Sequence, residues 1–249
     1  MAEEHVTIFS NAMNEWEVAT EQQSMNAFNN AISLMLLAIK KSPEPFARMY
    51  AFLSMAYYEA GICQAQQPGR NSEKQAKQLI DNAISYANSA LEIEPLEFRA
   101  QLVKTYIASD KLLYLQGGVS NLIPRAGISA AGVLEFFGRA ASTGVAAGKV
   151  GASQIKFKGE VKHLQEIYDQ VFSEYFMDAT EFCYFTEQLL NIADYCTNNK
   201  LAGAKEIFTS IVNVNPDDLK YDDLSDDGKV EVEQEVVKLR SLAEGRLMM

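Results

Sequence analysis

Apolar residues recur along this chain at intervals of three and four positions, the spacing of one face of an α-helix. The sequence contains no sustained alternation of apolar and polar residues, which is the pattern typical of a half-buried β-strand. The spacing therefore predicts an all-α protein. Prolines, glycines and short polar stretches separate the predicted helices, which cover residues 8–19, 24–41, 46–65, 73–92, 97–113, 161–176, 185–196, 204–211 and 232–243.

The predicted helices pair into hairpins. Pro43 and Pro45 close the first pair, and a turn with the sequence Gln-Gln-Pro-Gly-Arg-Asn-Ser separates the helices of the second, with Ser72 as the expected N-cap of the later helix. We expect the helices over 97–113 and 161–176 to pair across an intervening insertion. The last helix is rich in glutamate and has the polar outer face of a capping helix.

One spacing occurs three times in the second helices of these hairpins: an alanine, an apolar residue four positions later, another three positions after that, and a proline five positions further on. The copies are Ala31, Met35, Ala38, Pro43; Ala83, Ala87, Ala90, Pro95; and Ala204, Phe208, Ile211, Pro216. Steps of four and three keep these residues on one helix face, where small side chains let a partner helix approach closely. The proline cannot continue the helix and ends it. This pattern resembles the second helix of a tetratricopeptide (TPR) repeat.

The helix predicted over 46–65 resembles the first helix of such a repeat. The residues with the spacing of the family's Trp, Leu, Gly and Tyr positions are Tyr50, Leu53, Ser54 and Tyr57. From Tyr57 to Ala83 there are 26 residues, where the family pattern has about nine, and we interpret the difference as a lengthening of both helices. The resemblance implies a single domain over residues 1–249, a TPR-like α-solenoid of about four helical hairpins with a C-terminal capping helix.

The TPR family binds peptides or partner helices in a groove lined by its first helices. The resemblance places on that groove Arg48, Ala51, Met55, Tyr58 and Glu59. These residues lack the Lys and Asn set with which chaperone-binding members hold a terminal carboxylate, so capture of a chaperone tail is not expected. Met55 and Tyr58 favour contact with an apolar ligand, and a role in the core is the alternative for both. The resemblance thus implies a non-enzymatic scaffold or adaptor for a protein partner whose identity the sequence does not specify.

Residues 113–158 differ in composition from the rest of the chain. They contain Gly117, Gly118 and Pro124, followed by a stretch rich in glycine and alanine. Between residues 121 and 158, five basic residues stand against one acidic residue, a net charge of +4 that leaves −15 for the remainder. We therefore expect an atypical insertion whose partner differs from that of the acidic body.

Two interpretations of this insertion stay open. Its small residues recur every four positions from Ala140 to Ala152, so it can form a helix packed on the solenoid, or a loop. In the second interpretation it docks on a membrane surface or an acidic partner through the apolar and basic side chains of Leu134, Phe136, Phe137, Arg139 and Lys149. The protein would then be a peripheral membrane-associated assembly factor.

Composition narrows the classes of function. The net charge of −11 argues against a general nucleic-acid binder, since such proteins present basic residues to the phosphates. The three cysteines have no CxxC spacing, and we expect reduced, mostly buried thiols in a cytoplasmic protein. The acidic N-terminal segment does not resemble a signal peptide, and no run of about 18 apolar residues predicts a membrane-spanning helix.

Three motif-like segments are each better explained without a ligand. Residues 144–151 lack the spacing of a P-loop and the hydroxyl residue that follows its lysine. Glu160 and His163 form a single Glu-x-x-His motif, whereas di-iron bundles use two. Residues 223–234 follow EF-hand spacing but end on glutamine in place of the bidentate glutamate, and we expect the serine in this turn to cap the last helix. With no nucleophile beside a base, we expect no enzyme activity, metal or cofactor, although a site made of carboxylates alone would carry no such signature.

Overall fold

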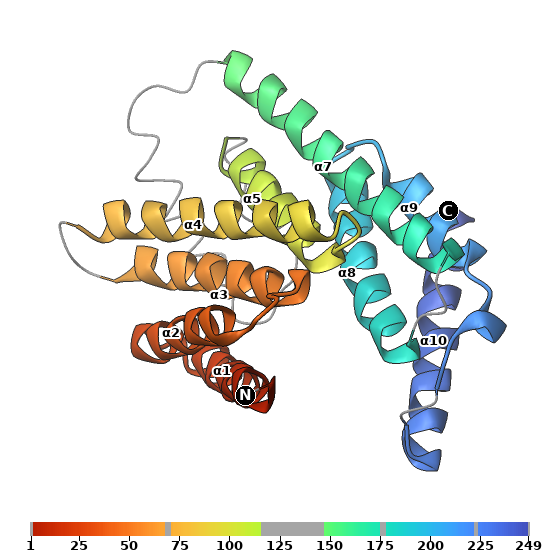
Figure 1. Cartoon of the computed structure of the whole chain (residues 1–249). Helices are drawn as coiled ribbons and strands as arrows, with labels where there is room; N and C mark the ends of the chain where they lie inside the picture. The colour runs from red at the N-terminus through yellow and green to blue at the C-terminus, as the bar shows by residue number, and fades with distance from the viewer. Residues whose placement is uncertain (1, 68–70, 116–146, 175–177, 222–223, 249) are drawn as a thin grey trace. The chain divides into compact units, whose positions relative to one another are not determined.

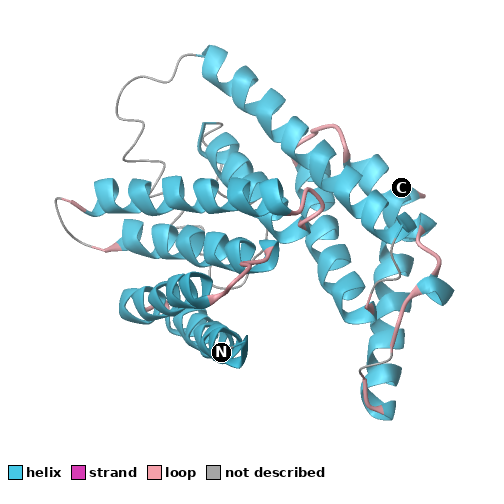
Figure 2. Cartoon of the chain, in the orientation of Figure 1, coloured by secondary structure: helices cyan, strands magenta, loops and turns pink. Residues whose placement is uncertain are grey.

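The regular secondary structure is helical, which confirms the predicted all-α class. The computed structural model (Figures 1 and 2) describes residues 2–67, 71–115, 147–174, 178–221 and 224–248. Within these ranges the backbone forms no β-strand, and an isolated bridge of β type joins Asp178 to Lys220. At this bridge the Ala179 N–H donates to the Lys220 carbonyl oxygen at 2.9 Å.

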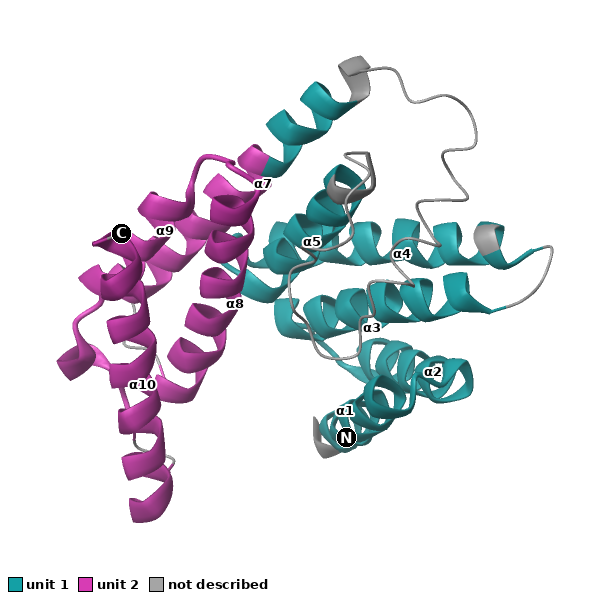
Figure 3. Ribbon diagram, turned by 180° about the vertical axis from the view of Figure 1, so that it is seen from behind, with its two compact units in different colours: residues 1–157 teal, residues 158–249 magenta. Residues whose placement is uncertain are grey.

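The chain divides into two compact units, residues 1–157 and residues 158–249 (Figure 3). We call them unit 1 and unit 2. The division falls within helix α7 (Ala147–Glu174), which gives its first turns to unit 1 and the rest to unit 2. The interpretation of the whole chain as one solenoid domain stays a prediction, and so does the expected pairing of the helices over 97–113 and 161–176.

Unit 1 is a series of helices that follow one another in the chain. Besides the first turns of α7 it contains α1 (Ala2–Gln22), α2 (Met25–Lys41), α3 (Ala47–Gln66), α4 (Ser72–Ile93) and α5 (Phe98–Leu115). From α1 to α5, each helix packs on the next, and α3 also contacts α1 and α5 (Figure 1). The bounds agree with the predicted helices to within a few residues, except that α1 begins at Ala2.

Small residues allow α3 and α4 to pack closely. Ala83 and Ala90 of α4 have no exposed surface. The Ser54 hydroxyl of α3 donates to the Ala83 carbonyl oxygen at 2.8 Å. A Cβ atom added at Gly61 would lie 2.8 Å from Ile80 Cδ1, so this glycine also marks a close approach of the two helices. The alanines of the second repeat copy therefore lie where two helices touch.

Unit 2 consists of the rest of α7 with α8 (Ala179–Asn198), α9 (Ala204–Asn213), the short 3-10 helix η1 (Pro216–Asp218) and α10 (Asp226–Leu247). Helices α8, α9 and α10 each pack on the other two. Helix α7 packs on α8 through Phe172, whose ring centroid lies 5.3 Å from that of Phe182. The Tyr168 hydroxyl also hydrogen bonds with Thr186 Oγ1 of α8 at 2.9 Å.

Serine side chains cap the starts of two helices. Ser24 Oγ accepts from the Ala27 N–H at 3.4 Å at the start of α2. Ser225 Oγ accepts from the Gly228 N–H at 3.2 Å at the start of α10, which confirms the predicted cap of the last helix.

The expected N-cap role of Ser72 is wrong. Ser72 is the first residue of α4, and the preceding Asn71 occupies the N-cap position. The Ser72 hydroxyl instead donates to the Gln64 carbonyl oxygen in the last turn of α3, at 2.5 Å. It therefore satisfies a carbonyl group at the end of one helix rather than an N–H group at the start of the next.

Helix α7 begins at Ala147, whereas the apolar pattern predicted a helix from residue 161. Its buried side chains are Phe157, Val161, Leu164, Ile167, Tyr168 and Val171. The buried stripe thus starts one turn before the predicted helix. The start of α7 could not be predicted from the sequence pattern, because the glycines upstream each lower helix propensity by up to about 1 kcal/mol relative to alanine. A Cβ atom at Gly151 or Gly159 would meet nothing within 4 Å, so these glycines leave no gap in the packing.

Candidate functional site

The residues predicted to line a groove belong to α3 and differ in accessibility. Arg48 is exposed and Met55 is half-buried. Tyr58 and Glu59 are buried, with 3% and 8% of their surface exposed, and Ala51 has none exposed. Of these five residues, Arg48 and Met55 therefore offer the accessible surface.

The Glu59 carboxylate accepts two hydrogen bonds from α1. Trp16 Nε1–H donates to Glu59 Oε2 at 2.8 Å, and the Thr20 hydroxyl donates to the same oxygen at 2.9 Å. A buried carboxylate is stable only when such donors replace the water it has lost. Glu59 therefore holds α1 against α3.

The neighbouring residue connects α3 to the helix on its other side. The Tyr58 hydroxyl donates to the Asp110 carboxylate of α5. Asp110 has no exposed surface, so this bond lies in the interior of unit 1. Tyr58 and Glu59 thus position three helices, and a role for either in partner binding stays a prediction.

Half-buried aromatic side chains lie on the side of α3 that carries Met55. The Phe52 ring centroid is 6.0 Å from that of Phe9 and 5.8 Å from that of Trp16, both in α1. The Arg99 guanidinium carbon of α5 lies 5.3 Å from the Phe52 centroid, within cation–π range. We call the surface formed by Phe9, Trp16, Arg48, Phe52 and Met55 the α1–α3 face.

Sequence reasoning did not assign Phe9, Trp16 or Phe52 to a surface. A signal for two of them was present, because Phe9 and Trp16 are seven residues apart and therefore lie on the same side of α1. Their contact with Phe52 depends on how α1 and α3 pack, which helical spacing alone does not specify.

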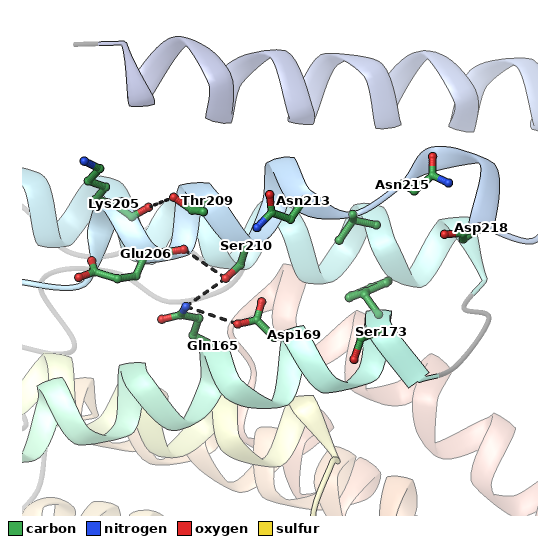
Figure 4. Close-up of a pocket in the computed structure, with 12 residues that line it drawn as sticks. Gln165, Asp169, Ser173, Lys205, Glu206, Thr209, Ser210, Asn213, Asn215 and Asp218 are labelled. Atoms are coloured by element: carbon green, nitrogen blue, oxygen red, sulfur yellow. Dashed lines mark hydrogen bonds between the residues drawn. The ribbon is translucent and has the colours of Figure 1, made fainter.

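A second candidate site is a groove in unit 2 between α7 and α9, with a volume of about 770 Å³ (Figure 4). Ten of its twelve lining residues have polar or charged side chains, and Phe172 and Val214 are the two apolar ones. This groove was not predicted from the sequence, because on α7 and α9 only the buried apolar residues were considered.

Helical periodicity explains why this groove is polar. On α7 the groove is lined by Gln165, Asp169, Phe172 and Ser173, whereas Leu164 and Tyr168 belong to the buried stripe of the helix. On α9 the lining includes Thr209 and Asn213, whereas the buried side is formed by Ile207, Phe208 and Ile211. Each helix therefore turns its apolar side to the core and a polar side to the groove.

One hydrogen bond crosses from α7 to α9. Gln165 Nε2–H donates to Ser210 Oγ at 3.0 Å, and the Ser210 hydroxyl donates to the Glu206 carbonyl oxygen at 3.1 Å (Figure 4). Ser210 is 6% exposed, so this contact lies at the bottom of the groove. It joins the two helices across the groove.

The groove has an excess of negative charge. Asp169, Glu206 and Asp218 carry carboxylates, and Lys205 is the single cation among the lining residues. None of these four side chains forms an ion pair within the part of the chain that the structure describes. Figure 4 shows Lys205 at one end of the groove and Asp218 at the other, so the negative charge continues beyond the reach of the lysine.

The three cysteines carry free thiols. Burial, followed by the nearby Glu235 carboxylate, raises the pKa of the Cys183 thiol to about 11. Burial and the Glu206 carboxylate raise the pKa of Cys196 to about 12, and burial also raises the pKa of Cys63. All three are therefore protonated at neutral pH and poor nucleophiles.

The residues proposed to dock the insertion fall largely outside the described ranges. This holds for Leu134, Phe136, Phe137 and Arg139, and Lys149 lies in the first turn of α7 with its side chain outside the description. In the described residues, no group of His, Cys, Asp and Glu side chains is placed to hold a metal ion. His163 is exposed, with Nδ1 3.7 Å from Glu166 Oε2.

Comparison with known proteins finds no family model, no curated protein and no solved structure that matches this chain. Across the described ranges, none of the helices combines the length and the hydropathy needed to cross a membrane.

Proposed function

We propose that this protein is a non-enzymatic scaffold or adaptor of TPR-like architecture, and that it binds a partner peptide or helix on the α1–α3 face. The observation that carries the proposal is the order of helix contacts. In unit 1 each helix packs on the next, and the odd-numbered α1, α3 and α5 also form contacts with their odd-numbered neighbours. This is the order expected of stacked hairpins, in which the first helices line a common surface.

Unit 2 has the same order of contacts on a smaller scale. Helices α8 and α9 pack as consecutive neighbours, α9 packs on α10, and α8 contacts α10. These three pairwise contacts match those among α3, α4 and α5 in unit 1. It supports the assignment of α8 as a first helix, α9 as a second helix and α10 as the capping helix.

Two of the three copies of the repeat spacing end their helices in the same way. In α2 and α4 the residue after the helix donates its N–H to the carbonyl of the third motif residue, as Ser42 does to Ala38 and Glu94 to Ala90, each at 2.9 Å. In α9 the Val214 N–H donates to the carbonyl of Ile211, the third motif residue, at 3.4 Å, across three positions instead of four. The motif proline follows within two positions of the donating residue in every copy. The matching ends of α2 and α4, together with the proline at the same motif position in all three copies, support a repeat origin.

The α1–α3 face has the chemistry of a protein-binding surface. Aromatic and methionine side chains dominate the centres of protein interfaces, because they offer large contact areas at small entropic cost. Phe52 and Met55 are half-buried, so each keeps accessible apolar area. Arg48 adds one exposed cation at the edge. We therefore expect an apolar peptide or the apolar side of an amphipathic helix as the ligand.

Substitution of Met55 tests this proposal. Met55→Asp places a charge in the centre of the face, and we expect it to abolish recovery of the partner when the tagged full-length chain is isolated from its native cell. The matched control is Leu37→Asp on α2, an apolar residue with 39% of its surface exposed that is not part of the face. Equal recovery with the wild-type chain and Met55→Asp would refute the assignment of the face.

A second candidate function is that of a peripheral membrane-associated assembly factor that docks through the insertion at 113–158. The net charge of +4 between residues 121 and 158 supports it, since an anionic membrane attracts basic segments. Flotation with anionic liposomes separates this function from the first, because a scaffold that acts through the α1–α3 face has no need of lipid.

A further inference from the structure

The groove between α7 and α9 has the dimensions of a short extended peptide. Its α7 side runs from Gln165 to Ser173. The eight steps between these two residues span about 12 Å at a rise of about 1.5 Å per residue. An extended chain covers that length with about four residues at roughly 3.3 Å each. The volume of about 770 Å³ leaves room for such a segment.

The groove also offers the hydrogen-bonding groups that a peptide backbone requires. The Asn213 side chain forms no hydrogen bond with other described residues, so both its amide donor and its carbonyl acceptor are open to a ligand. The hydroxyls of Ser173 and Thr209 donate to carbonyls of their own helices at 3.2 and 2.9 Å. Their lone pairs still accept hydrogen bonds from a ligand.

The charge of unit 2 determines which peptide the groove attracts. Residues 158–249 contain nine basic and nineteen acidic residues, a net charge of −10, so this unit holds nearly all of the −11 of the chain. Within the groove, Asp169 accepts a hydrogen bond from Gln165 Nε2–H at 3.5 Å. Asp169 and Asp218 form no ion pair, and both lie away from the end that carries Lys205 (Figure 4). A field of this sign accelerates the approach of cations and repels anions.

We propose that the groove between α7 and α9 binds an extended peptide segment that contains lysine or arginine, with its cationic side chains on Asp169 and Asp218. This site is separate from the α1–α3 face and does not rest on it. A phosphate-bearing ligand would meet three carboxylates against one lysine, and an apolar helix would find only Phe172 and Val214 to bury against.

Fluorescence anisotropy with the full-length chain tests the proposal. The probe is a labelled peptide in which lysine and alanine alternate, and the comparison peptide has glutamate in place of lysine. We expect the lysine peptide to bind, with an affinity that falls as salt rises. The glutamate peptide should not bind. Binding of both peptides with equal affinity would overturn the proposal.

Two double variants with the same change in charge separate the groove from the overall charge of unit 2. Asp169→Asn with Asp218→Asn removes the groove carboxylates and should weaken the lysine peptide by at least about fivefold. The control is Asp217→Asn with Glu187→Gln, two exposed residues that do not line the groove, and it should change the affinity by less than about twofold.

The result that would overturn the proposal is an equal loss in both double variants, because the peptide would then respond only to the net charge of the unit. All four residues are exposed, so we expect the variants to fold, and circular dichroism checks this. Met55→Asp should leave the affinity for the lysine peptide unchanged. The double variant Asp169→Asn with Asp218→Asn therefore reports on the groove alone, and Met55→Asp reports on the α1–α3 face alone.

Discussion

Two adjacent residues of α3 hold α1 and α5 in place. Glu59 accepts hydrogen bonds from Trp16 and Thr20, and Tyr58 donates to Asp110. A polar group in the interior is costly when its partner is removed, because neither water nor another side chain replaces the lost bond. The stability of unit 1 should therefore depend on these contacts more than on the exposed ion pairs of the chain.

We expect Glu59→Ala to lower the free energy of unfolding by about 1–3 kcal/mol, since it leaves the Trp16 and Thr20 donors without their acceptor. Trp16→Phe is the comparison: it removes one donor and keeps the bond from Thr20, and should cost less. Urea unfolding of the full-length chain measures both. A Glu59→Ala protein as stable as the wild type would contradict the role assigned to this carboxylate.

Ala83 lies at the contact of α3 and α4, where its carbonyl oxygen accepts from Ser54. Ala83→Leu should overpack this contact and destabilise the protein by about 1–3 kcal/mol. Asn88→Leu places the same side chain on the exposed side of α4 and should change stability by less than about 0.5 kcal/mol. The denaturation midpoint reports both changes, and an unchanged midpoint for Ala83→Leu would disprove the repeat register.

The sequence identified Ala83 and Ala90 correctly as contact residues, because small side chains at helical spacing carry that information directly. It offered a core role for Tyr58 only as an alternative, and it gave no signal that Glu59 is buried. Their hydrogen-bond partners lie 39 to 52 positions away along the chain, on helices whose packing the spacing does not determine. The helix face on which a residue lies follows from the local spacing, whereas the burial of that face depends on how helices distant in the sequence pack.

Among the elements, ends marked by proline were the most predictable. Helices α2 and α4 end two residues before Pro43 and Pro95, as the repeat spacing predicted. The start of α7 was missed, because its first turns carry glycines that weaken the helical signal. The prolines therefore located helix ends more accurately than the apolar spacing located the start of a helix whose first residues have low helix propensity.

The glycines of unit 2 and of α7 allow a test of helix propensity against backbone strain. Gly151→Ala and Gly159→Ala should each stabilise the protein by about 0.5–1 kcal/mol, because alanine is the better helix former and its Cβ meets nothing there. Gly203→Ala should instead destabilise by about 1–2 kcal/mol, since Gly203 has a φ of 112° before α9. Thermal unfolding of the three variants measures the difference. A loss of stability in both the Gly151→Ala and the Gly159→Ala proteins would contradict the helical conformation of α7 at these two positions.

At the scale of the whole molecule, charge is distributed unevenly. Unit 1 has thirteen basic and fourteen acidic residues, a net charge of −1, whereas unit 2 carries −10. The basic insertion predicted from the sequence belongs almost entirely to unit 1 and offsets its acidic residues. We therefore expect partners of opposite charge for the two parts: acidic or membrane surfaces for the insertion, and basic segments for unit 2.

Deletion of residues 121–146 tests the docking function of the insertion. The deletion ends at 146 because α7 begins at Ala147, and a short Gly/Ser bridge replaces the segment. We expect the helical signal and the unfolding midpoint to persist, because a change of loop length costs only about 0.6 kcal/mol per doubling. Binding to anionic liposomes should be lost, and Arg139→Glu with Lys149→Glu should weaken it in a salt-dependent manner. Unfolding of the deleted protein would show instead that the segment belongs to the core.

Site-specific photo-crosslinking in the native cell shows most directly whether this helical protein holds a partner on the α1–α3 face. A photoreactive amino acid replaces Met55 in one version of the chain and Leu37 in a second version. We expect a discrete crosslinked partner from position 55 and none from position 37. A partner captured from position 37 alone, or the same partner from both positions, would contradict this expectation.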